Sequence, residues 1–257
     1  MNKFLAQSSM KGIFSMYQNY IFDLYGTLAD IHTDEEQPLL WEKLAYFMAM
    51  QGAHYTPAEL HTRYQDLIRE EEAQTQAVIF SSTAPNGAAE IDISVIFHKL
   101  FEQKGISASE QLVARTAMFF RSVSLEKLRL FEGVTELLQK LRYAGKQVYL
   151  LSNAQKLFTR PELISLKLTP YFNGILLSSE AGHKKPDPYF YEMLLTQYKL
   201  DPACSVMIGN DDIADCHGAA AVGLDSMYIC TEQSPVRTRS LPEHCIELSN
   251  ISDVFLI

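Results

Sequence analysis

Between residues 133 and 230 the chain alternates short apolar runs with longer amphipathic segments. The apolar runs predict buried strands, which we expect at 147–153, 174–180, 204–210 and 225–230. The amphipathic segments predict helices, which we expect at 133–145, 154–168, 187–200 and 213–223. Pro161 predicts a break or restart within the second helix, and Asp187 with Pro188 predicts the start of the third. This alternation predicts an α/β fold: a Rossmann-like, doubly wound parallel sheet with helices on both faces.

Residues 31–127 interrupt this alternation. Four amphipathic stretches predict helices at 38–52, 56–78, 91–105 and 107–128, and a turn-rich loop at 81–90. We therefore expect a helical cap at 31–127, inserted into a catalytic core made of 17–30 and 128–257. Residues 1–16 are expected to form a flexible tail.

The composition is that of an ordinary globular protein, with 47% hydrophobic and 21% charged residues. The net charge of -9 argues against a nucleic-acid or anionic-membrane partner, because both favour a basic protein face. No apolar run approaches the ~20 residues of a membrane span, and the first 20 residues make a poor signal peptide. The four cysteines form no CxxC pair, so we expect them to be small buried hydrophobic residues. This fits a protein of the reducing cytoplasm.

Polar residues follow the predicted strands. The segment YIFDLYGT ends a first strand on Asp23, and Ser152 ends a later one. Residues 180–185 and 210–215 follow the next two strands. Because functional groups gather beyond the carboxyl ends of parallel strands, we expect these residues at one edge of the sheet.

Four blocks of sequence, DLYGT, LLSN, GHKKPDPYFYE and IGNDDIADCHGA, occur in this order. Together they resemble the haloacid dehalogenase-like hydrolase superfamily, in the branch with a helical cap after the first strand. The resemblance implies that Asp23 is a nucleophile, which forms a covalent intermediate that water then cleaves. Gly26 allows a tight turn there, and the Thr27 hydroxyl can fix the aim of Asp23.

Tyr25 departs from the phosphatase pattern. Most phosphatases of this superfamily have a second aspartate at this position, which acts as a general acid. A tyrosine is familiar from the dehalogenase branch, where halide leaves without a proton. In the phosphatases the backbone carbonyl at this position also binds magnesium. A residue with any side chain, tyrosine included, has this carbonyl.

The second and third blocks imply substrate-binding groups. The Ser152 hydroxyl, with Asn153 beside it, can hold a phosphoryl or carboxylate oxygen. The resemblance selects Lys185, directly before Pro186, to neutralise Asp23 and the substrate oxyanion. Lys184 is interpreted as a solvated neighbour, and Tyr191 as a packing residue.

The fourth block is rich in acids. When the fourth block is aligned with the family pattern on Asp215, Asn210 occupies the position of the family's first acid, and Asp211 comes next. Oxygen ligands suit Mg²⁺, so Asn210, Asp211 and Asp215 are candidate ligands together with Asp23 and the Tyr25 carbonyl. Alternatively, Asp211 and Asp215 could face Lys185, or the acids could simply favour a helix N-terminus.

Three histidines lie near the motifs or the start of the cap, namely His32, His183 and His217. We interpret them as surface or packing residues. An alternative for His32 is that it lines the entrance beneath the cap. The dehalogenase branch has a cap arginine that holds the substrate carboxylate. At that place this chain has Glu42, and Arg63 and Arg69 lie in other contexts.

The sequence therefore favours a magnesium-dependent phosphatase of a small phosphorylated metabolite, acting through an aspartyl-phosphate on Asp23. One alternative is a metal-independent 2-haloacid dehalogenase that forms an aspartyl ester. Another is a non-catalytic binding module on the same fold, although Asp23 and Lys185 are both retained. The apolar cap helices fit a monomer or a homodimer, and nothing in 31–127 identifies the substrate.

Overall fold

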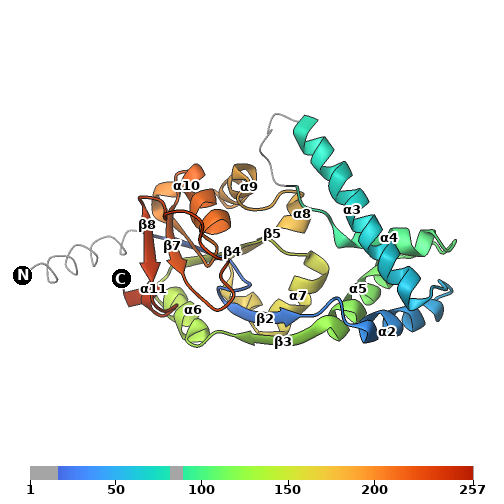
Figure 1. Ribbon diagram of the computed structural model, residues 1–257. Helices are drawn as coiled ribbons and strands as arrows, with labels where there is room; N and C mark the ends of the chain where they lie inside the picture. The colour runs from blue at the N-terminus through green and yellow to red at the C-terminus, as the bar shows by residue number, and fades with distance from the viewer. Residues whose placement is uncertain (1–16, 82–88, 257) are drawn as a thin grey trace, which may run out of the picture.

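The computed structural model describes residues 17–81 and 89–256. Its centre is a six-stranded parallel sheet with the strand order β5-β4-β1-β6-β7-β8, flanked by helices (Figure 1). The strands are β1 (Asn19–Phe22), β4 (Gln147–Ser152), β5 (Gly174–Leu177), β6 (Ser205–Gly209), β7 (Asp225–Ile229) and β8 (Cys245–Leu248). The prediction of a doubly wound α/β fold is confirmed.

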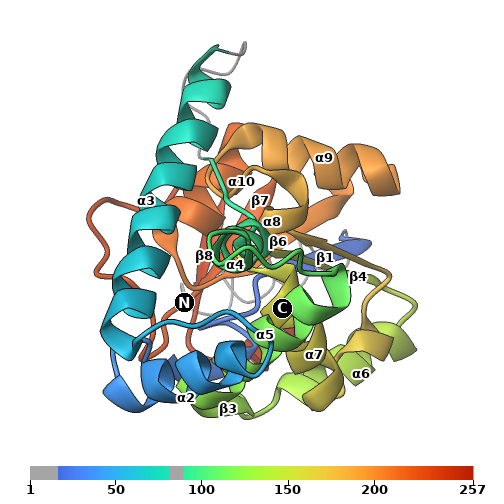
Figure 2. The ribbon, with the colours of Figure 1, turned by 90° about the vertical axis from the view of Figure 1, so that its right-hand side faces the viewer.

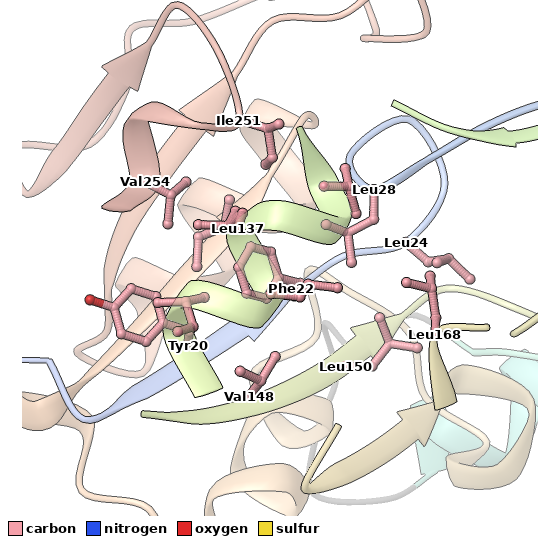
Figure 3. Packing of buried hydrophobic residues seen from close by; sticks show 14 of the residues in the cluster. Tyr20, Phe22, Leu24, Leu28, Leu137, Val148, Leu150, Leu168, Ile251 and Val254 are labelled. Atoms are coloured by element: carbon pink, nitrogen blue, oxygen red, sulfur yellow. The ribbon is translucent and has the colours of Figure 1, made fainter. Parts of the chain in front are cut away.

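The side chains of β1 alternate between two hydrophobic clusters, one on each face of the sheet. Tyr20 and Phe22 belong to the first cluster, which includes residues of α6 (Val134–Tyr143) and α11 (Asp253–Leu256), as Figure 3 shows. Ile21 belongs to the second, with residues of α9 (Pro188–Tyr198) and α10 (Gly218–Ala221). Strand β1 is therefore buried on both faces, and its carboxyl end lies in the middle of the sheet edge.

Most helices of this core lie where the periodicity predicts them. Helix α9 begins as expected, with Pro188 in its first turn and the Asp187 carboxylate accepting a bond from Tyr189 N at 3.0 Å. Helix α7 (Lys156–Ser165) runs through Pro161, so the predicted break is wrong. The helix predicted at 213–223 begins as a π-helical turn, η3 (Asp212–His217), and continues as α10. Short 3₁₀ turns are η1 (Thr169–Tyr171) and η2 (Pro202–Cys204).

Several predicted boundaries were wrong. The strand expected at 174–180 ends at Leu177 and is followed by the short helix α8 (Ser178–Ala181). The helix expected at 107–128 ends at Ser124, and β3 (Leu125–Leu130) pairs antiparallel with β2 (Ala29–Thr33). Neither β2 nor β8 was predicted. Whether such a short segment forms a strand depends on its pairing with a strand far away in the sequence.

Between β2 and β3 the described residues form four helices, which we call the helical insertion. They are α2 (Pro38–Ala49), α3 (Pro57–Ser81), α4 (Ile93–Glu102) and α5 (Glu110–Ser124). They lie at one side of the sheet, and Figure 2 looks onto them. Their apolar faces form a cluster of their own.

One buried residue of the core, Phe158, also belongs to the cluster of the insertion, and its neighbour Leu157 packs against that cluster. Phe158 of α7 stacks on Phe120 of α5, with ring centroids 6.0 Å apart. The Arg121 guanidinium lies over the same Phe158 ring, 5.0 Å from its centroid. Helix α7 therefore joins the insertion to the sheet.

Three other sequence predictions concern the tail and one loop, the cysteines and the possibility of a membrane span. The tail at 1–16 and most of the loop at 81–90 lie outside the described residues. Of the four cysteines, Cys216 is buried as predicted, Cys204 and Cys245 are half-buried, and Cys230 is exposed, so the prediction is wrong for Cys230. No helix among the described residues is long and apolar enough to cross a lipid bilayer.

Candidate active site

Asp23 directly follows β1, and its carboxylate is buried among donors from several segments. Its backbone N–H donates to Ile208 O of β6 at 2.9 Å, which fixes the turn against the sheet. Ser152 Oγ at the end of β4 donates to Asp23 Oδ1 at 3.1 Å, and Thr27 Oγ1 donates to Oδ2 at 3.3 Å. Lys185 Nζ donates to Oδ1 at 2.8 Å. The structure thus brings these four predicted residues together.

Lys185 is almost completely buried between two carboxylates. Its ammonium lies 2.8 Å from Asp23 and 2.7 Å from Asp215. Burial lowers the pKa of Lys185, but the attraction of Asp215 and Asp23 outweighs it, so the pKa is raised and the ammonium stays charged. Asn153 holds the backbone here: its Oδ1 accepts from Lys185 N at 2.7 Å, and its Nδ2 donates to Lys185 O at 2.9 Å.

Asp215 is the second buried carboxylate. Its Oδ1 faces Lys185, and its Oδ2 accepts from Asp211 N at 3.0 Å. Burial raises the pKa of Asp215 to about 6; Lys185 opposes this shift and Asp23 adds to it. The end of β6 must be a glycine, because a Cβ at Gly209 would lie 2.0 Å from Asp215 Oδ2.

Asn210 and Asp211 complete the acid-rich loop. Asn210 Oδ1 accepts from Thr27 Oγ1 at 3.1 Å, and its amide packs on Gly26, where a Cβ would lie 2.4 Å from Asn210 Nδ2. Gly26 also has a φ of +82°, which favours glycine. Asp211 Oδ1 accepts from the backbone N–H groups of residues 213 and 214, as a helix cap does.

The fit of this site to a metal ion is partial. Among the described residues, no three His, Cys, Asp or Glu side chains converge as a metal-binding group. The oxygen atoms that remain as candidates are the Asp23 carboxylate, the Tyr25 carbonyl and the Asn210 amide. The charges do favour a cation, since Asp23, Asp211 and Asp215 line the same pocket as a single lysine.

Tyr25 directs its hydroxyl toward α7. The hydroxyl donates to Glu162 and lies 2.9 Å from Thr159 Oγ1. On its other side, Glu162 Oε1 accepts from Arg121 Nε of α5 at 2.6 Å. Burial, and next the charge of Glu162, raise the pKa of Tyr25 far above its ordinary value, so the phenol keeps its proton. The sequence prediction missed Glu162 and Arg121, because neither lies in a motif.

These groups enclose a pocket of about 180 Å³. Its described lining consists of Asp23, Tyr25, Ser152, Asn153, Lys185, Asn210, Asp211, Ala214, Asp215, Gln233 and Pro235. Gln233 and Pro235 come from the segment after β7 and were not predicted. No sequence motif marks the segment that holds Gln233 and Pro235. Its place beside the pocket depends on how the rest of the chain folds.

The secondary candidates of the sequence analysis do not line this pocket. His183 pairs with Asp187, His217 contacts Ser240 O, and His32 lies near Glu126. Arg63 and Arg69 both pair with Asp66, and Glu42 is exposed. Lys184 is half-buried outside the pocket. Tyr191 is completely buried in the second core cluster, where its hydroxyl donates to Ala214 O.

Comparison with known proteins extends this picture. The chain is 26% identical over 161 residues to a phosphoserine phosphatase of Thermus thermophilus, covering 63% of each protein. It is 25% identical over 143 residues to a glyceraldehyde 3-phosphate phosphatase of Methanothermobacter thermautotrophicus, covering 56% of this chain and 63% of that relative. The chain thus spans less than two thirds of the length of these relatives.

Solved structures with a similar fold cover nearly the whole chain. A 2-haloacid dehalogenase from Pseudomonas syringae superposes with a TM-score of 0.61 at 21% identity, covering 94% of this chain and 99% of that one. A phosphatase from Thermococcus onnurineus gives a TM-score of 0.54 at 18% identity, covering 89% and 93%. At these identities the likeness shows the fold alone.

A family model described as haloacid dehalogenase-like hydrolase matches residues 17–223. The match includes β1, the helical insertion and every strand through β6, together with all four sequence blocks. Because it covers most of the chain, the protein belongs to the haloacid dehalogenase-like hydrolases.

Proposed function

We propose that this hydrolase is a magnesium-dependent phosphatase of a small phosphorylated metabolite, acting through an aspartyl-phosphate on Asp23. The observation that carries the proposal is the excess of carboxylates around Lys185. Asp23, Asp211 and Asp215 line the pocket, and Lys185 is the only cation among its described lining residues. A phosphate dianion needs further positive charge to enter such a pocket, and a divalent cation would supply it.

The geometry supports an in-line displacement. The Asp23 carboxylate attacks phosphorus, and the bond from phosphorus to the leaving oxygen breaks. Lys185 Nζ and Ser152 Oγ, which now contact Asp23 Oδ1, would hold the phosphoryl oxygens. Water then cleaves the aspartyl-phosphate, which restores Asp23 and releases inorganic phosphate. Because the Tyr25 hydroxyl donates to Glu162, it does not serve as the general acid; the departing oxygen is then a good leaving group, or takes its proton from water or from a residue of the cap.

Magnesium, when bound, would offset the negative charge of the phosphoryl group and of the surrounding acids. The residues that would hold it are Asp23 through its carboxylate, Tyr25 through its carbonyl and Asn210 through its amide oxygen. Asp211 and Asp215 would remain around this set: Asp215 is bonded to Lys185, and Asp211 caps η3.

The helical insertion would then act as the cap of the enzyme, with 31–127 as its limits and 17–30 with 128–257 as the core. Relatives named as phosphatases of phosphoserine and of glyceraldehyde 3-phosphate support a small phosphorylated substrate. The acidic net charge and the absence of a CxxC pair support a cytoplasmic enzyme without a nucleic-acid partner.

Hydrolysis of p-nitrophenyl phosphate with and without magnesium tests the proposal. This ester has a good leaving group, so it needs no general acid. We expect magnesium-dependent turnover in the wild type and a loss of about 10³-fold or more in Asp23→Asn. Asp66→Asn, which changes a carboxylate of the helical insertion, should retain turnover. Full turnover by Asp23→Asn would contradict the mechanism.

A second candidate function is 2-haloacid dehalogenation, which Tyr25 in the first motif favours. In that reaction Asp23 attacks carbon, halide leaves without a proton, and water cleaves the ester. Release of halide from 2-chloropropionate, without added magnesium and without any phosphatase activity, would favour this alternative.

A further inference from the structure

Two of the four cysteines lie on the same face of the sheet, near the candidate active site. Cys245 begins β8, the edge strand (Figure 1), and pairs in register with Ser226 of β7. The residues that follow them, Met227 and Ile246, belong to or pack against the first hydrophobic cluster. Because side chains alternate along a strand, Ser226 and Cys245 face the opposite side, which is the side covered by α10. The turn η3, which leads into α10, contacts β7 there.

Cys216 of η3 is the second cysteine on this face. Its thiol is completely buried, whereas Cys245 is half-buried. The two thiols contact each other through a hydrogen bond, and both lie beside the Ser226 hydroxyl. The hydrogen bond with Cys216 lowers the pKa of Cys245 to about 7, so part of Cys245 is thiolate at neutral pH. An accessible thiolate next to a second thiol is the arrangement in which a cysteine is oxidised and then resolved as a disulfide.

The other two cysteines lack this arrangement. Cys204 Sγ lies 3.8 Å from the Asp201 carboxylate, in the turn before β6, and Cys230 is exposed after the end of β7. Neither contacts a second thiol in the described part of the chain. An intramolecular disulfide is therefore expected between Cys216 and Cys245 alone.

The position of Cys216 couples this pair to the candidate active site. It directly follows Asp215, whose carboxylate accepts from Lys185 Nζ at 2.7 Å. An S–S bond of about 2.05 Å is much shorter than a contact between two thiols, so forming it requires a movement. Strand β8 is held by four residues paired with β7, whereas Cys216 N donates to Asp211 O at only 3.4 Å. The movement should therefore fall on η3 and displace Asp215 from Lys185.

We propose that Cys216 and Cys245 form a redox-sensitive thiol pair, which a hydroperoxide converts to a disulfide that lowers the activity of the adjacent site. The Cys245 thiolate attacks the hydroperoxide: an S–O bond forms, the O–O bond breaks, and the departing oxygen takes a proton as water or an alcohol. The Cys216 thiol then attacks the sulfenic sulfur. The S–S bond forms, the S–O bond breaks, and the hydroxide leaves as water with the thiol proton. The two electrons lost by the thiols have reduced the peroxide.

Peptide mapping by mass spectrometry, with and without hydrogen peroxide, tests the pairing. We expect a cross-linked peptide joining Cys216 to Cys245, which dithiothreitol separates. Hydrolysis of p-nitrophenyl phosphate by the oxidised protein should fall by about tenfold or more and return with dithiothreitol, because Asp215 and Lys185 are displaced. Backbone hydrogen exchange across 211–217 should also rise in the oxidised protein, and this readout needs no enzymatic activity.

Cys216→Ser and Cys245→Ser should each prevent the cross-link and retain turnover after peroxide treatment. If the buried position does not tolerate serine, Cys245→Ser alone gives the answer, because Cys245 is half-buried. Cys230→Ser is the matched control: it removes an exposed thiol outside the pair, so its response to peroxide should equal that of the wild type.

The outcomes separate this inference from the proposed function. Absence of a disulfide between Cys216 and Cys245 after peroxide treatment would overturn the inference, as would a disulfide form with undiminished turnover. If the reduced protein hydrolyses no phosphate ester, the proposed function fails, and hydrogen exchange decides the inference. Unchanged exchange across 211–217 in the disulfide form would then overturn it, and increased exchange would support it.

Discussion

The ammonium of Lys185 lies 2.8 Å from the carboxylate of Asp23, at the carboxyl end of the central strand. Asp215 holds the same ammonium from its other side at 2.7 Å, and the lysine is only 3% exposed. One buried positive charge therefore keeps two buried carboxylates together. We expect both the stability of this edge and the proposed reaction to depend on that charge.

Replacement of Lys185 by methionine should be severe. It leaves Asp23 and Asp215 as buried like charges, so we expect a loss of about 3–5 kcal/mol in the free energy of unfolding. Turnover should fall by at least about 10²-fold, because no other lysine or arginine lines the pocket among the described residues. Urea unfolding and p-nitrophenyl phosphate hydrolysis measure the two effects. Lys184→Met is the control, and an equal loss there would contradict the assignment.

Tyr25→Phe separates a positioning role from acid catalysis. Loss of the hydroxyl leaves Glu162 without one donor, so we expect a loss of about 1–2 kcal/mol in stability. Turnover of an ester with a poor leaving group should change by less than about threefold, because the phenol already donates its proton to Glu162. A fall of about 10²-fold or more for that ester, with p-nitrophenyl phosphate unaffected, would make Tyr25 the proton donor.

The ion pair between Arg121 and Glu162 should show strong coupling. Their side chains are 15% and 6% exposed, so Arg121→Met or Glu162→Gln alone leaves a buried group without its partner. We expect each single variant to lose about 3 kcal/mol, and the double variant to lose clearly less than the sum. A double-mutant cycle by urea unfolding measures this coupling, and additive losses would show that the pair is independent.

Glu90 predicts a pH dependence. Burial raises its pKa above the ordinary value of 4.5, with the Ser178 hydrogen bond opposing. A carboxyl with a raised folded-state pKa favours the folded state below its unfolded pKa, and this contribution is lost as the pH rises through the folded pKa. The stability of the wild type relative to Glu90→Gln should therefore fall as the pH rises from about the ordinary pKa of 4.5 through the raised folded-state pKa. Glu42→Gln, at an exposed position, should show no such trend.

The sequence predicted the central fold because its signals are local. Asp187 and Pro188 mark the start of α9, and apolar runs mark β4, β6 and β7, so the motif residues could be assigned to strand ends. Strand β3 was missed because Leu125 and Leu128 also fit a helical spacing, and only its pairing with β2 decides the conformation.

The parts of the site that were missed all depend on tertiary contacts. Arg121 lies far along the insertion from the place where a cap arginine was sought, and it reaches the site only because α5 packs on α7. Gln233 and Pro235 belong to an irregular loop without a recognisable pattern. Their approach to Asp23 follows from the position of β7 beside β6, which no local signal contains.

The place of Phe158 in the cluster of the insertion has a consequence for how the chain folds. The apolar interior of α2 to α5 is completed by a ring that the ribosome makes only after the whole insertion. We therefore expect the insertion to reach its final packing only after α7 has docked beside the sheet. We expect the two parts to unfold in one cooperative transition. A change at Phe158, a residue outside the four inserted helices, should destabilise both parts together.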